Sequence, residues 1–433
     1  MNQKPQISKL ATWSCLLFAT LLSSTLLEAN DATELNTQFV ELQSYLTQAL
    51  AANPRLEAFE RRYEAAMQRI PQASALPDPM FQVTHFVESV QTRTGPQKNV
   101  FLLSQKIPWF GKLSSRQNVA SAEAEALWYA YQNQQLMLAR MVSLRFYEYG
   151  YTKEAIQLTQ KNRDLLRELE PIVEEKVRSG GDLNALLRLK VEIGAIDDRL
   201  QSLRQKRVAQ SAKLGELLAL TESTLLPWPE WEAPETISLD GLSLAASIQA
   251  NNPELQMLER KITSAAARRE IARLESYSDI TLGLNYIRVG DPVVNPTTPD
   301  AGHDPWGFTV AVNIPIWFEK YNATKAEALA TQRSFESEYD NRLNELRAEL
   351  FASLAILDDA NRRLKLYGDE LLGLAEQAVE NTRSSYESGR TGILEVIDSE
   401  RSLLDLQLLY WRAASDAWQQ RIVIQTLANL PIL

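Results

Sequence analysis

The chain contains the same unit twice, and this repeat constrains its fold more than any other feature of the sequence. Residues 53–57 (NPRLE) return 199 positions later as residues 252–256 (NPELQ). Pro108 and Gly180 return 207 and 209 positions later, in similar local sequences. Three landmarks in one order, with a slowly growing offset, indicate a tandem duplication. The offset grows because the second copy has a longer loop near residues 292–305.

The two copies are predicted to span residues 30–220 and 244–433. Between them, residues 221–243 contain a Pro- and Trp-rich run, LPWPEWEAP, whose prolines forbid a continuous helix. We expect this segment to be a linker that lies against the body of the protein.

Residues 1–29 have the pattern of a secretory signal peptide. Lys4 and Lys9 precede an apolar run over residues 10–27, and Ala29 offers a small residue for cleavage. An uncleaved anchor helix is the alternative. The only cysteine, Cys15, lies inside this run, so the mature chain would have no disulfide and no thiolate nucleophile. The net charge of −10 argues against nucleic-acid binding.

Each copy is predicted to be mainly helical. The Asn-Pro pairs at residues 53 and 252 are typical of a helix N-cap followed by its first residue. Very long polar-rich helices are expected over residues 112–178 and 320–387, each followed by a Gly turn and a return helix. A 67-residue helix is about 100 Å long, and an opening helix stacked on a return helix is nearly as long. We expect Pro171 to kink the first long helix or to mark a different local arrangement.

Leucines at alternating steps of three and four predict shallow, left-handed helix packing, as in a coiled coil. An ordinary long helical bundle would show the same spacing. The helices alone therefore do not separate the two architectures.

Four segments alternate like strands, near residues 81–90, 99–107, 279–289 and 306–316. In the second copy the large apolar residues face one way: Leu282, Leu284, Tyr286, Phe308, Val310 and Val312. Strands of about ten residues with this alternation are typical of a transmembrane barrel, although a soluble sheet packed on helices would alternate equally well. Four strands cannot close a barrel around a pore. Several chains are therefore required, and three would supply twelve strands.

This arrangement resembles the TolC family of outer-membrane efflux proteins over essentially the whole mature chain. The resemblance is carried by the two Pro-Trp-Phe-Gly-Lys-like elements, at residues 108–112 and 315–320, and by Tyr386-x-x-Gly389 followed by Glu395-x-x-Asp398. The first element is most similar to the heavy-metal (CusC/CzcC-like) branch. The strand-to-helix junctions would then be Pro108, Trp109, Phe110, Pro315, Trp317 and Phe318.

The resemblance implies a TolC-like, mainly α fold: a homotrimer with a periplasmic α-barrel and a 12-stranded transmembrane β-barrel in the outer membrane. It implies a passive exit duct for metal ions or small toxic compounds, with no cofactor. The implied partners are a periplasmic adaptor (membrane fusion protein), an inner-membrane RND pump and outer-membrane lipid. The alternative is a periplasmic coiled-coil adaptor or structural protein of an export system.

The resemblance also implies a constriction at the periplasmic tip, formed by Glu395 and Asp398. Three residues apart, they share a helix face, although a plain solvated face would look the same. Counting from the glycines, the first copy has Leu186 and Leu189 at these positions, so one acidic ring is expected. The residues of the tip loops would be Gly180, Asp182, Tyr386, Gly389 and Arg390.

No catalytic or metal-binding motif accompanies these features. The sequence lacks His-Glu-x-x-His, Gly-x-Ser-x-Gly and the phosphate-binding Gly-x-x-x-x-Gly-Lys-Ser/Thr. It has two histidines, His85 in an expected strand and His303 in a polar loop. We therefore predict neither an enzyme nor a metal site.

Overall fold

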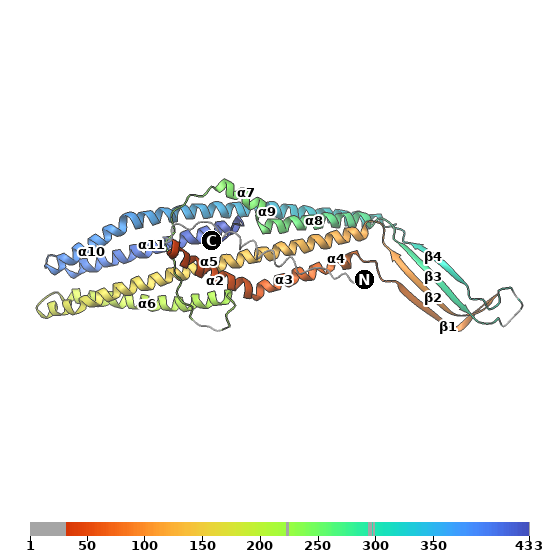
Figure 1. Ribbon diagram of the computed structural model, residues 1–433, viewed down its shortest axis with the longest axis horizontal. Helices are drawn as coiled ribbons and strands as arrows, with labels where there is room; N and C mark the ends of the chain where they lie inside the picture. The colour runs from red at the N-terminus through yellow and green to blue at the C-terminus, as the bar shows by residue number, and fades with distance from the viewer. Residues whose placement is uncertain (1–31, 222–224, 293–296, 298, 433) are drawn as a thin grey trace.

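The computed structural model describes an elongated molecule with helices along most of its length and a sheet at one end (Figure 1). The described residues are 32–221, 225–292, 297 and 299–432. The predicted signal peptide at residues 1–29 lies outside them.

Both copies have the same order of elements, as the duplication predicts. The first copy contains α2 (Ala32–Ala52), α3 (Pro54–Met67), α4 (Arg69–Ser74), β1 (Met80–Thr92), β2 (Gly95–Ile107), α5 (Lys112–Arg178) and α6 (Leu183–Leu217). The second contains α7 (Gly241–Asn251), α8 (Pro253–Leu274), β3 (Ile280–Val289), β4 (Trp306–Val312), α9 (Phe318–Lys365), the π-helical turn η1 (Leu366–Leu371), α10 (Leu372–Glu387) and α11 (Ile393–Leu427). The mainly α fold with four antiparallel strands is therefore confirmed.

The elements form one continuous layer, which we call the wall. The strands lie in the order β1-β2-β3-β4, all antiparallel. Next to the sheet the helices keep that order, with α3 and α4 on α5, α5 on α8, and α8 on α9. At the far end the neighbours are α6 and α5, α5 and α11, and α11 and α10. The outermost elements are thus β1, α3, α4 and α6 on one edge, and β4, α9 and α10 on the other.

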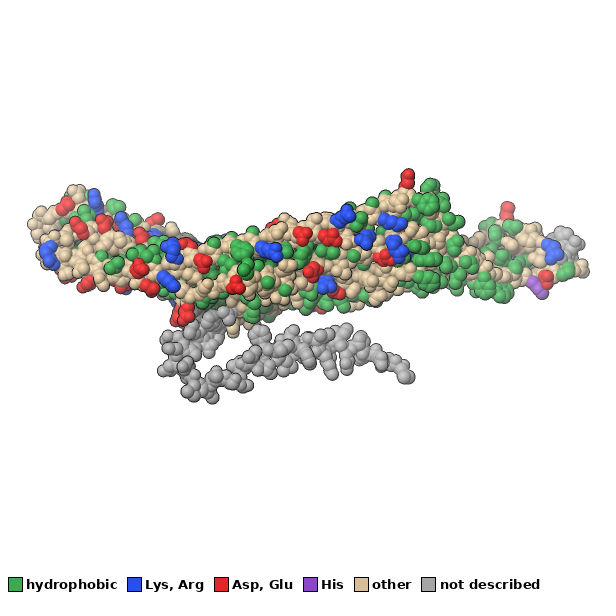
Figure 2. Space-filling model, turned by 90° about the horizontal axis from the view of Figure 1, so that it is seen from above, with side chains coloured by type: hydrophobic (Ala, Val, Ile, Leu, Met, Phe, Trp, Pro, Cys, Tyr) green, Lys and Arg blue, Asp and Glu red, His purple; other side chains and the backbone are tan. Residues whose placement is uncertain are grey.

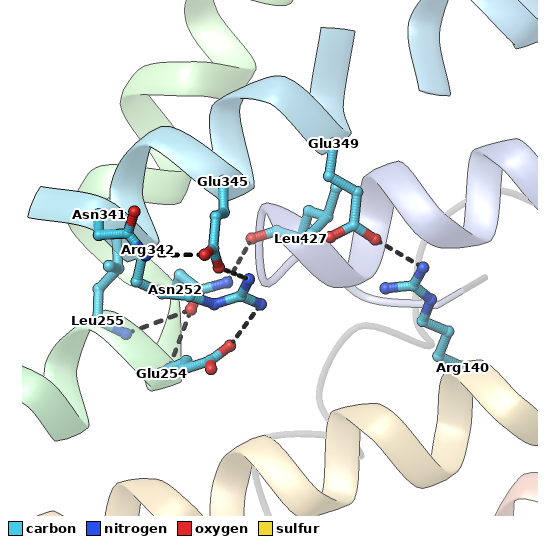
Figure 3. A network of polar contacts seen from close by, with 9 residues as sticks. All are labelled: Arg140, Asn252, Glu254, Leu255, Asn341, Arg342, Glu345, Glu349 and Leu427. Atoms are coloured by element: carbon cyan, nitrogen blue, oxygen red, sulfur yellow. Dashed lines mark hydrogen bonds and ion pairs between the residues drawn. The ribbon is translucent and has the colours of Figure 1, made fainter. Parts of the chain in front are cut away.

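Each Asn-Pro pair joins two helices end to end. Asn53 and Asn252 cap α3 and α8 through their side-chain oxygens, as predicted. Their amide nitrogens also donate to the last residue of the return helix, 3.2 Å to Leu217 O and 2.9 Å to Leu427 O. Figure 3 shows the second bridge beside the ion pair of Arg342 and Glu254. One side chain therefore pairs with backbone N–H groups at the start of one helix and with a backbone carbonyl at the end of the other, groups that have no partner within their own helices.

The largest core lies at the waist, where the linker crosses the helices. Tyr147 stacks on Trp418 with ring centroids 5.1 Å apart, and Trp231 of the linker packs on Tyr147. The indole nitrogen of Trp418 donates to Glu232 O at 2.9 Å. The linker is shorter than the predicted 221–243, because Asp240 caps α7 and starts it at Gly241. Residues 222–224 lie outside the described part.

One expected strand ends earlier than predicted. The strand expected over residues 306–316 stops at Val312, since Pro315 has no N–H to donate and Asn313 instead accepts a hydrogen bond from Asp279 N. The first long helix continues through Pro171 as one α-helix. The helices α2 and α7, which precede the Asn-Pro pairs, were not predicted. None of the described helices combines the length and apolar content that a membrane crossing requires.

Candidate functional site: the sheet, its junction with the helices, and the tip turns

One face of the sheet carries rows of large apolar side chains that cross all four strands. Cross-strand pairing places Phe81, Leu103, Leu284 and Phe308 in one row. The next row is Val83, Phe101, Tyr286 and Trp306. Rings in neighbouring strands contact each other, with centroids 6.3 Å apart for Phe81 and Phe101 and 6.1 Å apart for Phe101 and Tyr286.

The opposite face carries more small and polar residues, although Val100, Leu102 and Ile287 also lie on it. Ser104, Gly283 and Thr309 pair across three strands, and Asn285 pairs with Gly307. The six strand residues predicted to form the apolar face are all on it and all exposed in the single chain, from 41% for Tyr286 to 78% for Phe308. A row-wise apolar face that no described part of the chain covers indicates a contact surface.

The junction between sheet and helices exposes a second apolar group. Phe110, Trp317 and Phe318 are exposed by 80%, 69% and 73%, and Ile314 by 74%. Figure 2 shows hydrophobic side chains gathered where the helical body meets the sheet. By contrast, Pro108 is buried, and Trp109 stacks on Tyr277 with ring centroids 5.4 Å apart. A tryptophan, with its apolar ring and polar N–H, favours a membrane–water interface, and Trp317 is such a side chain.

A charged cluster that the sequence did not indicate fixes this junction. Asp279 lies 2.6 Å from Lys112 Nζ and 3.0 Å from Lys106 Nζ, and accepts from Trp109 N at 3.0 Å. Burial opposes ionisation of Asp279. The hydrogen bonds from Lys112, Trp109 and Lys106 outweigh that effect and lower its pKa to about 2. The cluster ties β2, the start of α5 and the start of β3 together.

The tip turns are built on left-handed glycines, Gly180 at φ 96° and Gly389 at φ 71°. After the first, Asp182 caps α6 through Asn184 N at 2.9 Å. In the second, Arg390 donates to Ser388 Oγ at 2.9 Å. The ring of Tyr386 is buried beneath Lys176 Nζ, 3.7 Å from the centroid, which links α10 to α5.

Glu395 and Asp398 are exposed in the first turns of α11. Asp398 lines a groove of about 580 Å³ between α6 and α11, together with Arg188, Glu192 and Arg401. Arg401 forms an ion pair with Glu192 across that groove. Both acids are therefore accessible near the tip, on the helix face that the spacing predicts.

The expected first-copy counterparts of these acids, Leu186 and Leu189, are wrong. α6 and α11 each contain 35 residues, and both ends differ by 210 positions. The second tip turn is one residue longer than the first, so an offset of 209 taken from the glycines misaligns the return helices. The true counterparts are Ala185 and Arg188. Leu189 is fully buried and belongs to the tip core.

Sequence reasoning also missed a buried ion pair near the tip. Glu400 is 2% exposed and pairs with Arg383 across the α10–α11 hairpin. Its backbone oxygen accepts from Asn162 Nδ2 of α5 at 3.4 Å. A buried glutamate one turn beyond Val396 could have been suspected from the apolar periodicity of α11. Among the residues that the structure describes, no three of His, Cys, Asp and Glu gather as a metal site would require.

Comparisons with known proteins agree with this geometry. Residues 244–430 match the family model described as "Outer membrane efflux protein". Among curated proteins, the chain is 23% identical to the cobalt-zinc-cadmium resistance protein CzcC of Cupriavidus metallidurans, over 88% of each chain. It is 21% identical to nodulation protein T of Rhizobium leguminosarum bv. trifolii, over 89% of this chain and 85% of that protein.

Solved structures share the fold over nearly the whole length. The channel CusC superimposes with a TM-score of 0.76 at 16% identity, covering 94% of this chain and 96% of that one. The outer-membrane channel OprN gives 0.75 at 14% identity, with 90% of each chain covered. The fold is therefore shared by both copies, and the family match lies in the second. Residues 244–430 therefore match the outer membrane efflux protein family, and the whole chain shares the fold of TolC-like outer-membrane efflux channels, with its long helical extension.

Proposed function

We propose that this chain forms, as a homotrimer, the exit duct of a tripartite efflux system. A periplasmic adaptor and an inner-membrane RND pump would complete that system. The observation that carries the proposal is the wall itself, whose two long edges are largely uncovered within the described residues, apart from α7 on α9. An edge that runs from sheet to tip needs a partner of the same length, and a second copy of the chain supplies it.

The strand edges give the strongest support for pairing with a second copy. β1 and β4 each pair on one side only within the described chain. An exposed edge next to an apolar sheet face invites pairing with another chain. Joining β4 of one copy to β1 of the next is a head-to-tail contact that closes into a ring. Three copies give twelve strands, enough for a lumen, with the apolar face towards lipid and the small polar face inside.

The helix edges support the same closure. On one edge α6 exposes Leu183, Leu187 and Val191 by 56%, 52% and 72%. On the other, α10 exposes Leu374 by 62%. α6 runs away from the tip and α10 runs towards it, so neighbouring copies would bring these helices together antiparallel. Apolar side chains left exposed in the single chain would then be buried in the trimer.

The tip acids supply the selective element. In a trimer, Glu395 and Asp398 would place six carboxylates around the axis. Such a ring attracts cations. The cargo we propose is metal ions or small toxic compounds, and the resistance protein CzcC is named for cobalt, zinc and cadmium. Residues 1–29 are proposed to export the chain, and residues 30–220 and 244–433 to act as its two repeat units.

Conductance in planar bilayers tests the gate. We expect the purified trimer with Glu395→Ala and Asp398→Ala to have a higher single-channel conductance and a weaker preference for cations than the wild type. The control is Glu380→Ala, which removes an exposed acid on α10 and should change neither value. Unchanged conductance and cation preference in the double variant would remove both residues from the constriction. A wild-type protein recovered from the outer membrane only as a monomer would refute the trimer.

A further inference from the structure

Between the landmarks that the two copies share, the second long helix contains one residue more than the first; it also begins two residues earlier, at Phe318. Lys112 opens α5 and recurs as Lys320, 208 positions later. The helices end at Arg178 and at Glu387, which are 209 positions apart. One residue has therefore been added between these landmarks in the second copy.

The structure shows where the added residue is accommodated. α5 is α-helical from end to end, whereas the second long helix widens into the π-helical turn η1 at Leu366–Leu371. A π-turn holds one residue more than an α-turn while the helix on either side keeps its position, and such turns are frequent at functional sites. The residues flanking η1 can therefore pack as they would without the insertion.

The surroundings of η1 fit its wider turn. Gly368 lies against Tyr410 of α11, and a Cβ added to this glycine would come within 3.1 Å of the tyrosine ring. Gly373 follows in the first turn of α10, where a Cβ would meet no neighbour. Glycine weakens a helix relative to alanine. The helix is therefore weakest where it also carries a spare residue.

Within a single chain, this region of an edge helix is held loosely between two anchored ends. From Lys365 to Ala378, all of which the structure describes, no side chain is buried. Leu364 is buried on the sheet side of this stretch, and Val379 on the tip side. The equivalent part of α5 buries Thr159, Asn162 and Leu166. Few buried contacts mark a segment of low local stability.

Beyond this stretch, two contacts hold the end of α10 in place. Arg383 pairs with the buried Glu400, and Tyr386 lies under Lys176 of α5. Both side chains sit just before the tip turn that leads to Glu395 and Asp398. A rotation of α10 would withdraw Arg383 and Tyr386 from their partners together.

We propose that η1 is a register joint for α10. When the π-turn relaxes to an α-helix, its spare residue joins the helix, which turns α10 by about 100° and advances it by about 1.5 Å towards the tip. The π form corresponds to the closed tip, with both contacts made. The α form breaks them and loosens the turn next to the acids. The inference rests on the proposed function in one respect, namely that the tip opens.

Deleting one residue from η1 tests the joint. Because the spare residue is dispensable for packing, deletion of Asp369 should leave a folded trimer with α10 in its present register but unable to switch. We expect the closed-state conductance of the wild type and at least about tenfold fewer openings. The matched control is deletion of Gln160 in α5, which has no spare residue and should lose its register and fail to assemble. A deletion variant of Asp369 that does not fold, or that opens as often as the wild type, overturns the proposal.

Amide hydrogen exchange of the unmodified protein gives a second, independent measurement. Peptides covering residues 366–378 should exchange at least about tenfold faster than those covering residues 157–169 of α5. After deletion of Asp369 the first set should become as protected as the second. Equal protection in the wild type would overturn the joint. If the wild type conducts no ions, the proposed duct fails, while the exchange comparison still decides whether η1 is a joint.

Discussion

Replacing Asn252 separates the two tasks of this residue and measures each of them. Its side-chain oxygen accepts from Glu254 N at 2.9 Å and from Leu255 N at 3.4 Å, and its amide donates to Leu427 O at 2.9 Å. Serine keeps an acceptor for the helix cap but is too short to reach Leu427. Alanine removes both functions.

The expected costs follow from these contacts. Loss of an N-cap costs about 1 kcal/mol. A buried carbonyl oxygen left without its donor costs about 1–3 kcal/mol, and Asn252 is only 5% exposed. We therefore expect Asn252→Ser to lower the free energy of unfolding by about 1–3 kcal/mol and Asn252→Ala by about 2–4 kcal/mol, about 1 kcal/mol more than serine.

The assay is denaturant unfolding of the detergent-solubilised protein, followed by circular dichroism, with amide exchange at the start of α8 as a local probe. The matched variants Asn53→Ser and Asn53→Ala should show the same order with smaller effects, because Asn53 is only half-buried and its bridge to Leu217 O is longer, at 3.2 Å. Equal stabilities of the wild type and Asn252→Ser would refute the bridge. Equal stabilities of the serine and alanine variants would refute the cap.

Two further predictions concern the junction and the edges of the wall. Asp279→Asn should lower the free energy of unfolding at pH 7 by about 3 kcal/mol, because it leaves the buried Lys112 without its counter-charge. The control Asp78→Asn, which replaces an exposed aspartate just before β1, should have almost no effect. The pKa of Asp279 is lowered to about 2, so its contribution to stability is complete above about pH 4 and disappears as the pH falls towards 2. The free energies of unfolding of Asp279→Asn and the wild type, measured by urea titration, should therefore converge near pH 2. A difference that stays constant with pH would contradict this explanation. The double variant Gly194→Cys and Leu374→Cys places one cysteine on α6 and one on α10, at similar distances from the tip. It should form disulfide-linked dimers and trimers on mild oxidation, visible on non-reducing gels, whereas Gly194→Cys with Ile356→Cys, far apart along the wall, should not. Cross-links confined to single chains would contradict the ring.

Local sequence patterns determined much of this molecule. The Asn-Pro pairs start α3 and α8 because an asparagine cap and a proline at the first position act within one turn. The strand alternation places the large apolar residues of the second copy on one face, since successive side chains of a strand point to opposite faces whatever packs on them. The glycines at 180 and 389 mark turns because they take up a left-handed backbone.

Only the tertiary structure decided how these local units meet. Asp279 is 167 residues from Lys112, and no local pattern pairs them. The growing offset between the copies reveals an added residue in the second long helix, but the offset does not show at which position of that helix the residue was added. The residue is accommodated at η1 because Gly368 there allows Tyr410 of α11 to approach, and because no side chain from Lys365 to Ala378 is buried. Local sequence fixes the elements through interactions within one turn or strand, whereas register between elements depends on contacts among residues far apart in the chain.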